Sequence, residues 1–171
     1  NTAAGQIYIL SGARGVGKTT TCQRLAAAIR ARELDLSGLI CPARFEGGTK
    51  VGIDLVDLRS GERRDLATAD SEPAPLRTDK YRFDGAAMAW GSQPIDAATP
   101  CALLIIDELG PLELIRRQGW VNALDVLRVG RFELAVVVVR TELVDGFMQL
   151  VPDLPSVVLD VADRGDREPE R

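Results

Sequence analysis

The chain contains short apolar runs that alternate with segments in which apolar residues recur at helical spacing. The run Gln6–Leu10 ends at Ser11-Gly12, which predicts a strand that enters a glycine-rich loop. From Thr19 to about Arg32 the apolar positions recur every three or four residues, which predicts a helix. Two later runs, Cys101–Ile106 and Leu134–Val139, are apolar throughout and predict strands that are buried on both faces.

The segment between these runs has a different, alternating pattern. Val51, Ile53 and Leu55 alternate with polar residues between two glycine turns, which indicates an antiparallel hairpin or three-strand meander over residues 39–68 with one solvent-exposed face. A helix is expected in part of Phe83–Thr99, where Gly91 and Pro94 should interrupt it. The remaining elements expected are a loop over Asp70–Tyr81, helices over Gly119–Val129 and Thr141–Leu150 with Thr141 as a cap, and a last strand over Val157–Leu159.

Helices that alternate with doubly buried strands predict an α/β fold. We expect a mainly parallel sheet, covered by helices on both faces, with the antiparallel meander around residues 39–68 attached to it. The chain has 171 residues, of which 46% are hydrophobic and 27% charged, and these values indicate a single domain over residues 1–171. The charged tail 162–171 is expected to fray.

The composition excludes several kinds of chemistry and of partner. Histidine is absent, which removes Ser-His-Asp hydrolysis, histidine-ligated zinc and imidazole acid–base catalysis. The net charge is −4 and no long basic run occurs, so nucleic acid is not an expected partner. Apolar runs are too short to span a membrane and no segment resembles a signal peptide, which favours a cytoplasmic location. Only three lysines occur, Lys18, Lys50 and Lys80.

The glycine-rich loop carries the strongest motif of the chain. Residues 12–19 fit G-x-x-x-x-G-K-[ST] between a predicted strand and a predicted helix. Such a loop turns backbone N–H groups toward a phosphate at the positive end of the helix. Lys18 would add a charge near the β- and γ-phosphates, and the Thr19 hydroxyl is a ligand that Mg²⁺ accepts. The residues expected to bind the nucleotide are Gly12, Ala13, Arg14, Gly15, Val16, Gly17, Lys18, Thr19 and Thr20, with the Arg14 side chain either along the nucleotide or in solvent.

An acidic pair follows the second apolar strand. A P-loop requires a carboxylate at the end of a nearby strand to complete the Mg²⁺ shell, and Asp107 has this position. Glu108 would orient and deprotonate an attacking water, which makes it a candidate catalytic residue. Glu113 is either a supporting residue of this site or a solvated loop carboxylate.

A third strand end offers a further catalytic candidate. Arg140 and Thr141 follow Leu134–Val139, where a strand lying between the two site strands would place a polar sensor of the γ-phosphate. The alternative is a helix cap and a surface charge. Trp90 and Trp120 are expected to pack in the core rather than to stack on a base.

Several stretches together resemble the cancer-related nucleoside-triphosphatase family of small P-loop proteins. The resemblance rests on Gly12–Thr20, on Gly52–Leu58 with Ser60–Arg63, on Lys80-Tyr81 and on Asp107–Glu113. It implies a P-loop NTPase fold and a slow, Mg²⁺-dependent hydrolysis of several nucleoside triphosphates, with Lys18 and Thr19 on phosphate and metal, Asp107 on metal and Glu108 as the base. Arg14 replaces a proline that is usual in the family, and the histidine often found near Arg140 is missing.

Three functions remain open at this stage. Hydrolysis is favoured because Glu108 suits water activation and the meander offers no obvious acceptor pocket. The second is a nucleotide or small-metabolite kinase, for which residues 61–82, with Arg63, Arg64, Arg77 and Arg82, would form a lid. The third is a nucleotide-gated regulatory subunit, although the sequence does not indicate a protein partner.

Overall fold

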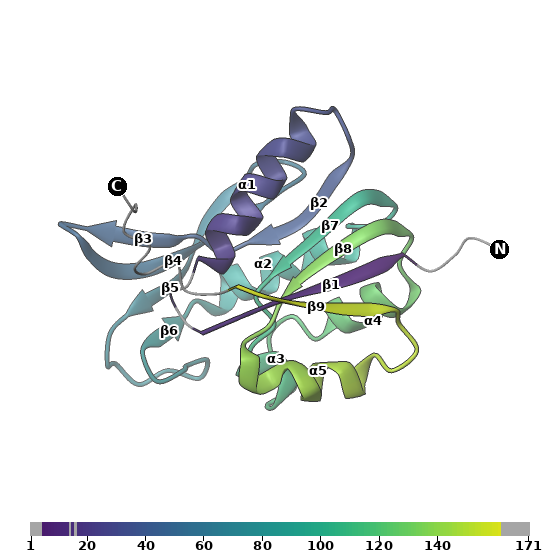
Figure 1. Ribbon diagram of the computed structural model, residues 1–171. Coiled ribbons are helices and arrows are strands. Elements are labelled where there is room, and N and C mark those ends of the chain that lie inside the picture. The colour runs from purple at the N-terminus through teal and green to yellow at the C-terminus, as the bar shows by residue number, and fades with distance from the viewer. Residues whose placement is uncertain (1–4, 14, 16, 162–171) are drawn as a thin grey trace, which may run out of the picture.

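The computed structural model describes residues 5–13, 15 and 17–161. Within this part of the chain, one sheet has nine strands, and five of them run parallel in the order β2-β7-β8-β1-β9 (Figure 1). These five strands are β1 (Gln6–Ser11), β2 (Leu36–Ile40), β7 (Cys101–Asp107), β8 (Phe132–Val138) and β9 (Ser156–Asp160). The apolar runs that predicted doubly buried strands form β7 and β8 at the centre of the sheet, where helices cover them on both faces.

Helices cover both faces of the sheet, as expected for an α/β fold. On one face α1 (Lys18–Arg30) buries Cys22 and Ala26 against strand residues such as Leu103 and Ile105. The other face carries α2 (Gly85–Asp96), α3 (Pro111–Leu114), α4 (Asn122–Val129), the 3₁₀ turn η1 (Thr141–Leu143) and α5 (Val144–Leu150). The predicted fold class is therefore confirmed. No helix within the described residues has the length and apolar character needed to cross a membrane.

The antiparallel part of the sheet is larger than the expected meander. It contains β3 (Ala43–Glu46), β4 (Thr49–Asp57), β5 (Arg63–Ala69) and β6 (Tyr81–Phe83), and β4 joins the parallel part by pairing with β2. Tyr81, expected at the end of a loop, begins β6 because it pairs with Ala69 of β5. The rest of the segment 70–80 has no regular helix or strand.

Helix α2 is continuous, so the expected interruption at Gly91 and Pro94 is wrong. Pro94 lies two residues before the helix ends, and the helix therefore loses one amide hydrogen bond near a terminus rather than in its middle. Gly91 is a packing residue, since a Cβ at this position would lie 2.7 Å from Nε1 of Trp120. Asp84 is the N-cap of the helix, and its side chain accepts a hydrogen bond from the amide of Ala87 at 2.7 Å.

Two other predicted helix starts differ from the structure. Thr141 does not cap a helix; it opens the turn η1, and α5 begins only at Val144. The Thr141 hydroxyl lies 3.4 Å from the hydroxyl of Ser11. Helix α4 begins at Asn122 rather than Gly119, because Gly119 has a φ of +66° in the left-handed region and cannot continue a helical turn.

Candidate functional site

The strand order brings three predicted site segments to one edge of the sheet. Strand β8 lies between β1 and β7, so the loop after β1, the acidic pair at the end of β7 and Arg140 after β8 all meet at the carboxyl ends of parallel strands. They line a single cavity of about 620 Å³. The predicted site residues that line it are Gly15, Gly17, Lys18, Thr19, Thr20, Asp107, Glu108 and Arg140. Of the other predicted residues, Gly12 and Ala13 contact Lys18, and Arg14 and Val16 lie outside the described part of the chain.

The side chain of Lys18 forms hydrogen bonds with the backbone of the P-loop. Gly15 and Gly17 have φ angles of +76° and +96°, a conformation that favours glycine. The Nζ atom of Lys18 donates hydrogen bonds to the carbonyl oxygens of Gly12 at 2.8 Å and Ala13 at 2.6 Å. Burial lowers the pKa of Lys18, while the nearby carboxylates of Glu108 and Asp107 act in the opposite direction. Its ammonium group is therefore positioned by backbone oxygens that a phosphate could replace.

Asp107 is a buried carboxylate with few polar partners. Its Oδ2 atom accepts a hydrogen bond from the amide of Cys41 at 3.0 Å. Burial raises the pKa of Asp107 to about 6, although hydrogen bonds from the Cys41 amide and the Thr19 side chain favour the charged form. A divalent cation next to Asp107 would offset the cost of burying this charge.

The residues present fit a magnesium ion that is shared with a substrate. Mg²⁺ is usually bound by one or two protein oxygens together with phosphate oxygens and water. The Thr19 hydroxyl and the Asp107 carboxylate are neighbours in the cavity and supply two such oxygens. No group of three or more carboxylate or thiol side chains within the described residues forms a self-sufficient metal site.

Glu108 and Arg140 form an ion pair across the ends of β7 and β8. The Nε atom of Arg140 donates to Oε1 of Glu108 at 2.8 Å. The Arg140 side chain is 16% exposed and that of Glu108 is 33% exposed, so both remain accessible from the cavity. One carboxylate oxygen of Glu108 and the two terminal nitrogens of Arg140 make no hydrogen bond to other described residues. These atoms are free to contact a bound water or phosphate.

Glu113 is a buried structural residue, so its interpretation as a solvated loop carboxylate is wrong. Its two oxygens accept hydrogen bonds from the amides of Gly110 at 3.0 Å and Trp120 at 3.2 Å. Burial raises its pKa, while these two amide donors act in the opposite direction. Glu113 therefore fixes the loop that follows Asp107 and Glu108. The three-residue spacing from Gly110 to Glu113 is the capping-box spacing, a signal that could have indicated this role.

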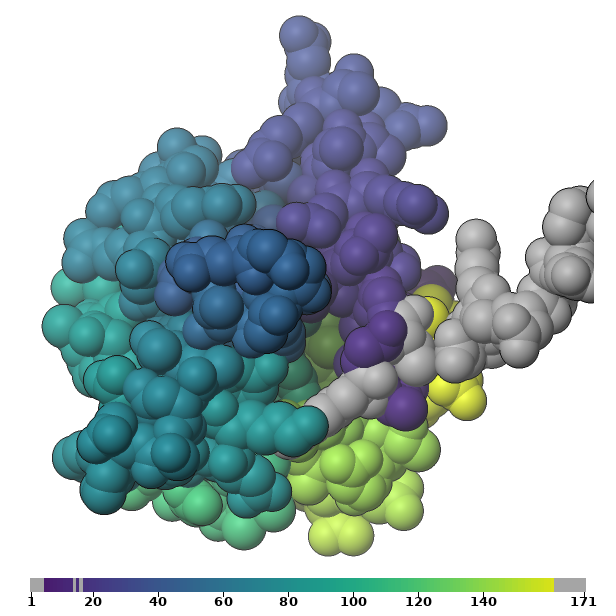
Figure 2. Space-filling model, turned by 90° about the vertical axis from the view of Figure 1, so that its left-hand side faces the viewer, coloured from purple at the N-terminus to yellow at the C-terminus, as the bar shows by residue number. Residues whose placement is uncertain are grey.

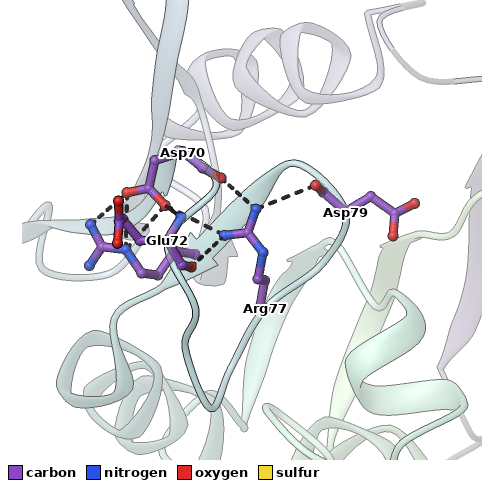
Figure 3. A network of polar contacts seen from close by, with 5 residues as sticks. Asp70, Glu72, Arg77 and Asp79 are labelled. Carbon is purple, nitrogen blue, oxygen red and sulfur yellow. Dashed lines mark hydrogen bonds and ion pairs between the residues drawn. The ribbon is translucent and has the colours of Figure 1, made fainter.

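The arginines expected to form a kinase lid are engaged elsewhere. Arg63 pairs with Asp54, and Arg64 pairs with Glu62 and lies 4.4 Å from the ring centroid of Trp90. Figure 3 shows Arg77 and Asp70 in the network of the 70–82 segment, in which Asp70 also accepts from Arg82 at 2.6 Å. None of these four arginines, all of them described, lines the cavity. The arginine pattern of residues 61–82 therefore gives no support to a kinase lid.

Residues of the antiparallel strands also line the cavity, which the sequence did not indicate. In Figure 2 the β3–β4 hairpin, in blue, projects beside the purple start of α1. The expectation that the meander offers no obvious acceptor pocket is therefore wrong. Residues from this region that line the cavity are Phe45, Lys50, Ile53, Leu66, Thr78, Lys80, Tyr81 and Phe83.

Comparison with known proteins identifies the family to which the chain belongs. The sequence model of the family described as NTPase matches residues 7–167. The chain belongs to the NTPase family. Its resemblance to small P-loop nucleoside-triphosphatases is thereby confirmed, as is the expectation of an enzyme of this family.

Curated relatives in this family carry the name nucleoside-triphosphatase THEP1. The protein from Caldivirga maquilingensis is 29% identical over 145 residues, which cover 85% of this chain and 82% of that protein. The protein from Methanopyrus kandleri is 32% identical over 107 residues, which cover 62% of this chain and 58% of that protein. The alignments with this protein and with several other relatives of the same name span less than two thirds of the length of those relatives.

Two solved structures share the fold. A solution structure of a human cancer-related nucleoside triphosphatase superposes with a TM-score of 0.72 at 21% identity, covering 94% of this chain and 90% of the other. The crystal structure of THEP1 from Aquifex aeolicus gives a TM-score of 0.67 at 17% identity, covering 92% and 90%. At these identities the likeness establishes the fold.

Proposed function

We propose that this NTPase-family protein hydrolyses nucleoside 5′-triphosphates to the diphosphate and phosphate in a Mg²⁺-dependent reaction. The observation that carries the proposal is the single cavity that contains Lys18, Asp107 and the Glu108–Arg140 pair. The printed names of the relatives support the same activity. We further propose that base selectivity is low, because the recognition elements identified in the site all serve the phosphates.

We assign each of these residues a part in binding the substrate. Lys18 would release the carbonyls of Gly12 and Ala13 and donate to oxygens of the β- and γ-phosphates. Amides of the P-loop, including those of Gly15 and Gly17, would add hydrogen bonds at the start of α1. Thr19 and Asp107 would hold Mg²⁺, which neutralises developing charge on the phosphates when it is bound.

Glu108 and Arg140 would assist the transfer of the γ-phosphoryl group to water. The free oxygen of Glu108 would accept a proton from a water molecule that attacks the γ-phosphorus, while the bond from that phosphorus to the β–γ bridging oxygen breaks. Arg140 would hold the Glu108 carboxylate through Nε and present its terminal nitrogens to the γ-phosphate. The negative charge that forms on the phosphate oxygens would then lie between Lys18 and Arg140.

Phosphate release from ATP, GTP, CTP and UTP, each with and without Mg²⁺, tests the proposal. We expect release with all four nucleotides and loss of release when Mg²⁺ is removed by a chelator. The absence of phosphate release with every nucleotide, in a protein that still binds them, would show that hydrolysis is not the activity.

A further inference from the structure

All three lysines of the chain line the same cavity, although they lie far apart in the sequence. Lys18 belongs to α1, Lys50 to β4, and Lys80 precedes β6. Among the described residues, neither Lys50 nor Lys80 forms an ion pair with a carboxylate, whereas Arg44 and Arg82 do. Lys50 instead lies 4.9 Å from the ring centroid of Tyr81. The cavity therefore has two positive charges that no described carboxylate neutralises.

The segment that presents Lys80 is held in place by hydrogen bonds. The guanidinium of Arg77 donates to the carbonyl of Glu72 at 3.0 Å and also to that of Asp70, as Figure 3 shows. The carbonyl of Arg77 accepts from Arg116 at 2.7 Å, and the amide of Thr78 donates to the carbonyl of Tyr81 at 3.0 Å. Lys80 therefore extends from an ordered loop.

The cavity that the lysines line also has apolar walls. Leu66, Met88 and Trp120 line it and belong to the hydrophobic cluster on the face of the sheet that carries α2. Phe83 packs against this cluster and lines the cavity as well. The indole nitrogen of Trp120 already donates to the carbonyl of Met88 at 2.9 Å, so its ring offers an apolar surface. We refer to the region lined by Leu66, Phe83, Met88 and Trp120 as the apolar chamber.

The apolar chamber is distinct from the place where the P-loop would hold a nucleotide. Helix α1, whose first turn would bind the phosphates, packs on the opposite face of the sheet through Cys22 and Ala26. Strand β7, which Glu108 follows, contributes Leu103 and Ile105 to the cluster that contains α1 residues and Leu104 and Ile106 to the cluster that contains the chamber residues. The start of α1 and the apolar chamber are therefore built from elements on opposite faces of the sheet.

We propose that the apolar chamber, together with Lys50 and Lys80, binds a second small molecule that has an anionic group on an aromatic or other apolar body. The lysines attract the anion, and the chamber removes the apolar body from water. This inference rests on the proposed function only in assigning the P-loop end of the cavity to the nucleotide.

Binding of 8-anilinonaphthalene-1-sulfonate, an anionic aromatic fluorophore, tests the proposal. The titration is done with the folded protein alone and again with Mg²⁺ and the non-hydrolysable analogue β,γ-imido-ATP. We expect one saturable site in both conditions. Lys50→Gln and Lys80→Gln should each raise the dissociation constant of the fluorophore roughly fivefold, whereas Lys50→Arg and Lys80→Arg should retain binding. Arg24→Gln, which removes an exposed charge on α1 outside the cavity, is the matched control and should have no effect.

A second variant tests the location independently of charge. Ile53→Phe adds volume to a cavity wall and should weaken fluorophore binding while leaving nucleotide affinity unchanged. The proposal is overturned if the nucleotide analogue displaces the fluorophore, if the two glutamine variants bind it as tightly as Arg24→Gln does, or if they weaken nucleotide binding instead. Nucleotide affinity that does not respond to Lys18→Ala would instead contradict the proposed function, whatever the fluorophore does.

Discussion

Arg140 and Glu108 are 32 residues apart in the chain, and the Nε of the first lies 2.8 Å from Oε1 of the second. The contact exists because β8 lies directly beside β7, so residues that follow the two strands project into the same cavity. The hydrogen bond from the Arg140 guanidinium restricts the orientation of the Glu108 carboxylate. The second oxygen of this carboxylate stays available to accept another hydrogen bond. In the proposed reaction the pair would combine a base with a group that stabilises charge on a phosphate.

Replacement of Arg140 should reduce turnover more than nucleotide binding. Arg140→Ala removes both the orientation of Glu108 and a donor to the γ-phosphate, and we expect kcat to fall by about 10²-fold. Arg140→Lys should recover only part of the loss, because an ammonium cannot make both contacts. Steady-state kinetics with a separate measurement of nucleotide affinity distinguishes the two effects. Arg128→Ala, an exposed residue of α4, is the control, and equal kinetics for both alanine variants would refute the role of Arg140.

Glu108→Gln should keep nucleotide binding and reduce kcat by about 10²-fold or more, since an amide cannot accept the proton of the attacking water. The glutamine oxygen can still accept the hydrogen bond from Arg140, so the local structure is retained. Single-turnover phosphate release measures the chemical step directly. Glu133→Gln, an exposed residue in β8, should match the unmodified protein. A near-normal rate for Glu108→Gln would mean that another group positions the water.

Lys18→Ala should abolish measurable turnover and raise the dissociation constant of Mg²⁺–ATP by about tenfold or more, because a charge-assisted hydrogen bond to phosphate is lost. The same substitution leaves the carbonyls of Gly12 and Ala13 without their present donor. Calorimetric titration of nucleotide and the thermal unfolding midpoint together separate loss of binding from loss of folding. Unchanged affinity in a folded variant would place the nucleotide elsewhere.

The sequence could predict the central part of the fold and the meeting of the P-loop with the acidic strand end in the candidate site. Residues 12–19 and the acidic end of Cys101–Ile106 are local signals, and parallel strands bring their ends to one edge whatever the details of packing. The predicted cap at Thr141 and the predicted start of a helix at Gly119 are wrong, because side-chain propensity says little about a 3₁₀ turn or about the left-handed φ of Gly119.

Other features depend on tertiary contacts that no local pattern shows. Gly91 lies inside a helix because Trp120 leaves no room for a Cβ there. Glu113 is buried because its oxygens accept hydrogen bonds from the backbone amides of Gly110 and Trp120. Lys50 and Lys80 line the same cavity because β4, β5 and β6 extend the sheet beside β2. One lysine in an alternating strand and another in an expected loop give no local sign that they share a cavity.

Asp107 should reduce stability at neutral pH when no metal is bound. Its pKa is raised from the ordinary value of 3.8 to about 6, so the native state keeps a proton that the unfolded state has already lost. The free energy of unfolding should therefore fall as the pH rises from about 4 to about 6, by at most about 3 kcal/mol. Asp107→Asn should lack this fall and should be more stable than the unmodified protein at pH 7.

Thermal unfolding at pH 4 and pH 7, with a chelator and then with Mg²⁺–ATP analogue, checks this expectation. The ligand should stabilise the unmodified protein strongly and Asp107→Asn weakly, since the variant lacks a charged metal ligand. Asp153→Asn, in an exposed turn, is the control. A variant that is less stable than the unmodified protein at both pH values would show that the carboxylate is stabilised in the native state.

Glu113 is expected to determine the stability of the loop that carries the catalytic candidates. Glu113→Ala leaves the buried amides of Gly110 and Trp120 without acceptors, and we expect a loss of about 2–4 kcal/mol in the free energy of unfolding. Glu113→Gln should cost less, because its single oxygen still accepts one of the two amides. Gly119→Ala should also destabilise this loop, since its Cβ would overlap Oε1 of Glu113 and its φ is +66°.

Denaturant unfolding of the three variants, with Glu142→Ala as an exposed control, measures these losses. Activity should fall in proportion to the disorder of residues 108–120, and added Mg²⁺ and nucleotide should recover part of it in Glu113→Gln, because ligand binding favours the native loop. A Glu113→Ala variant that unfolds at the same denaturant concentration as the control would show that water satisfies both amides, and the loop would then be held by the packing of Leu112 and Trp120 alone.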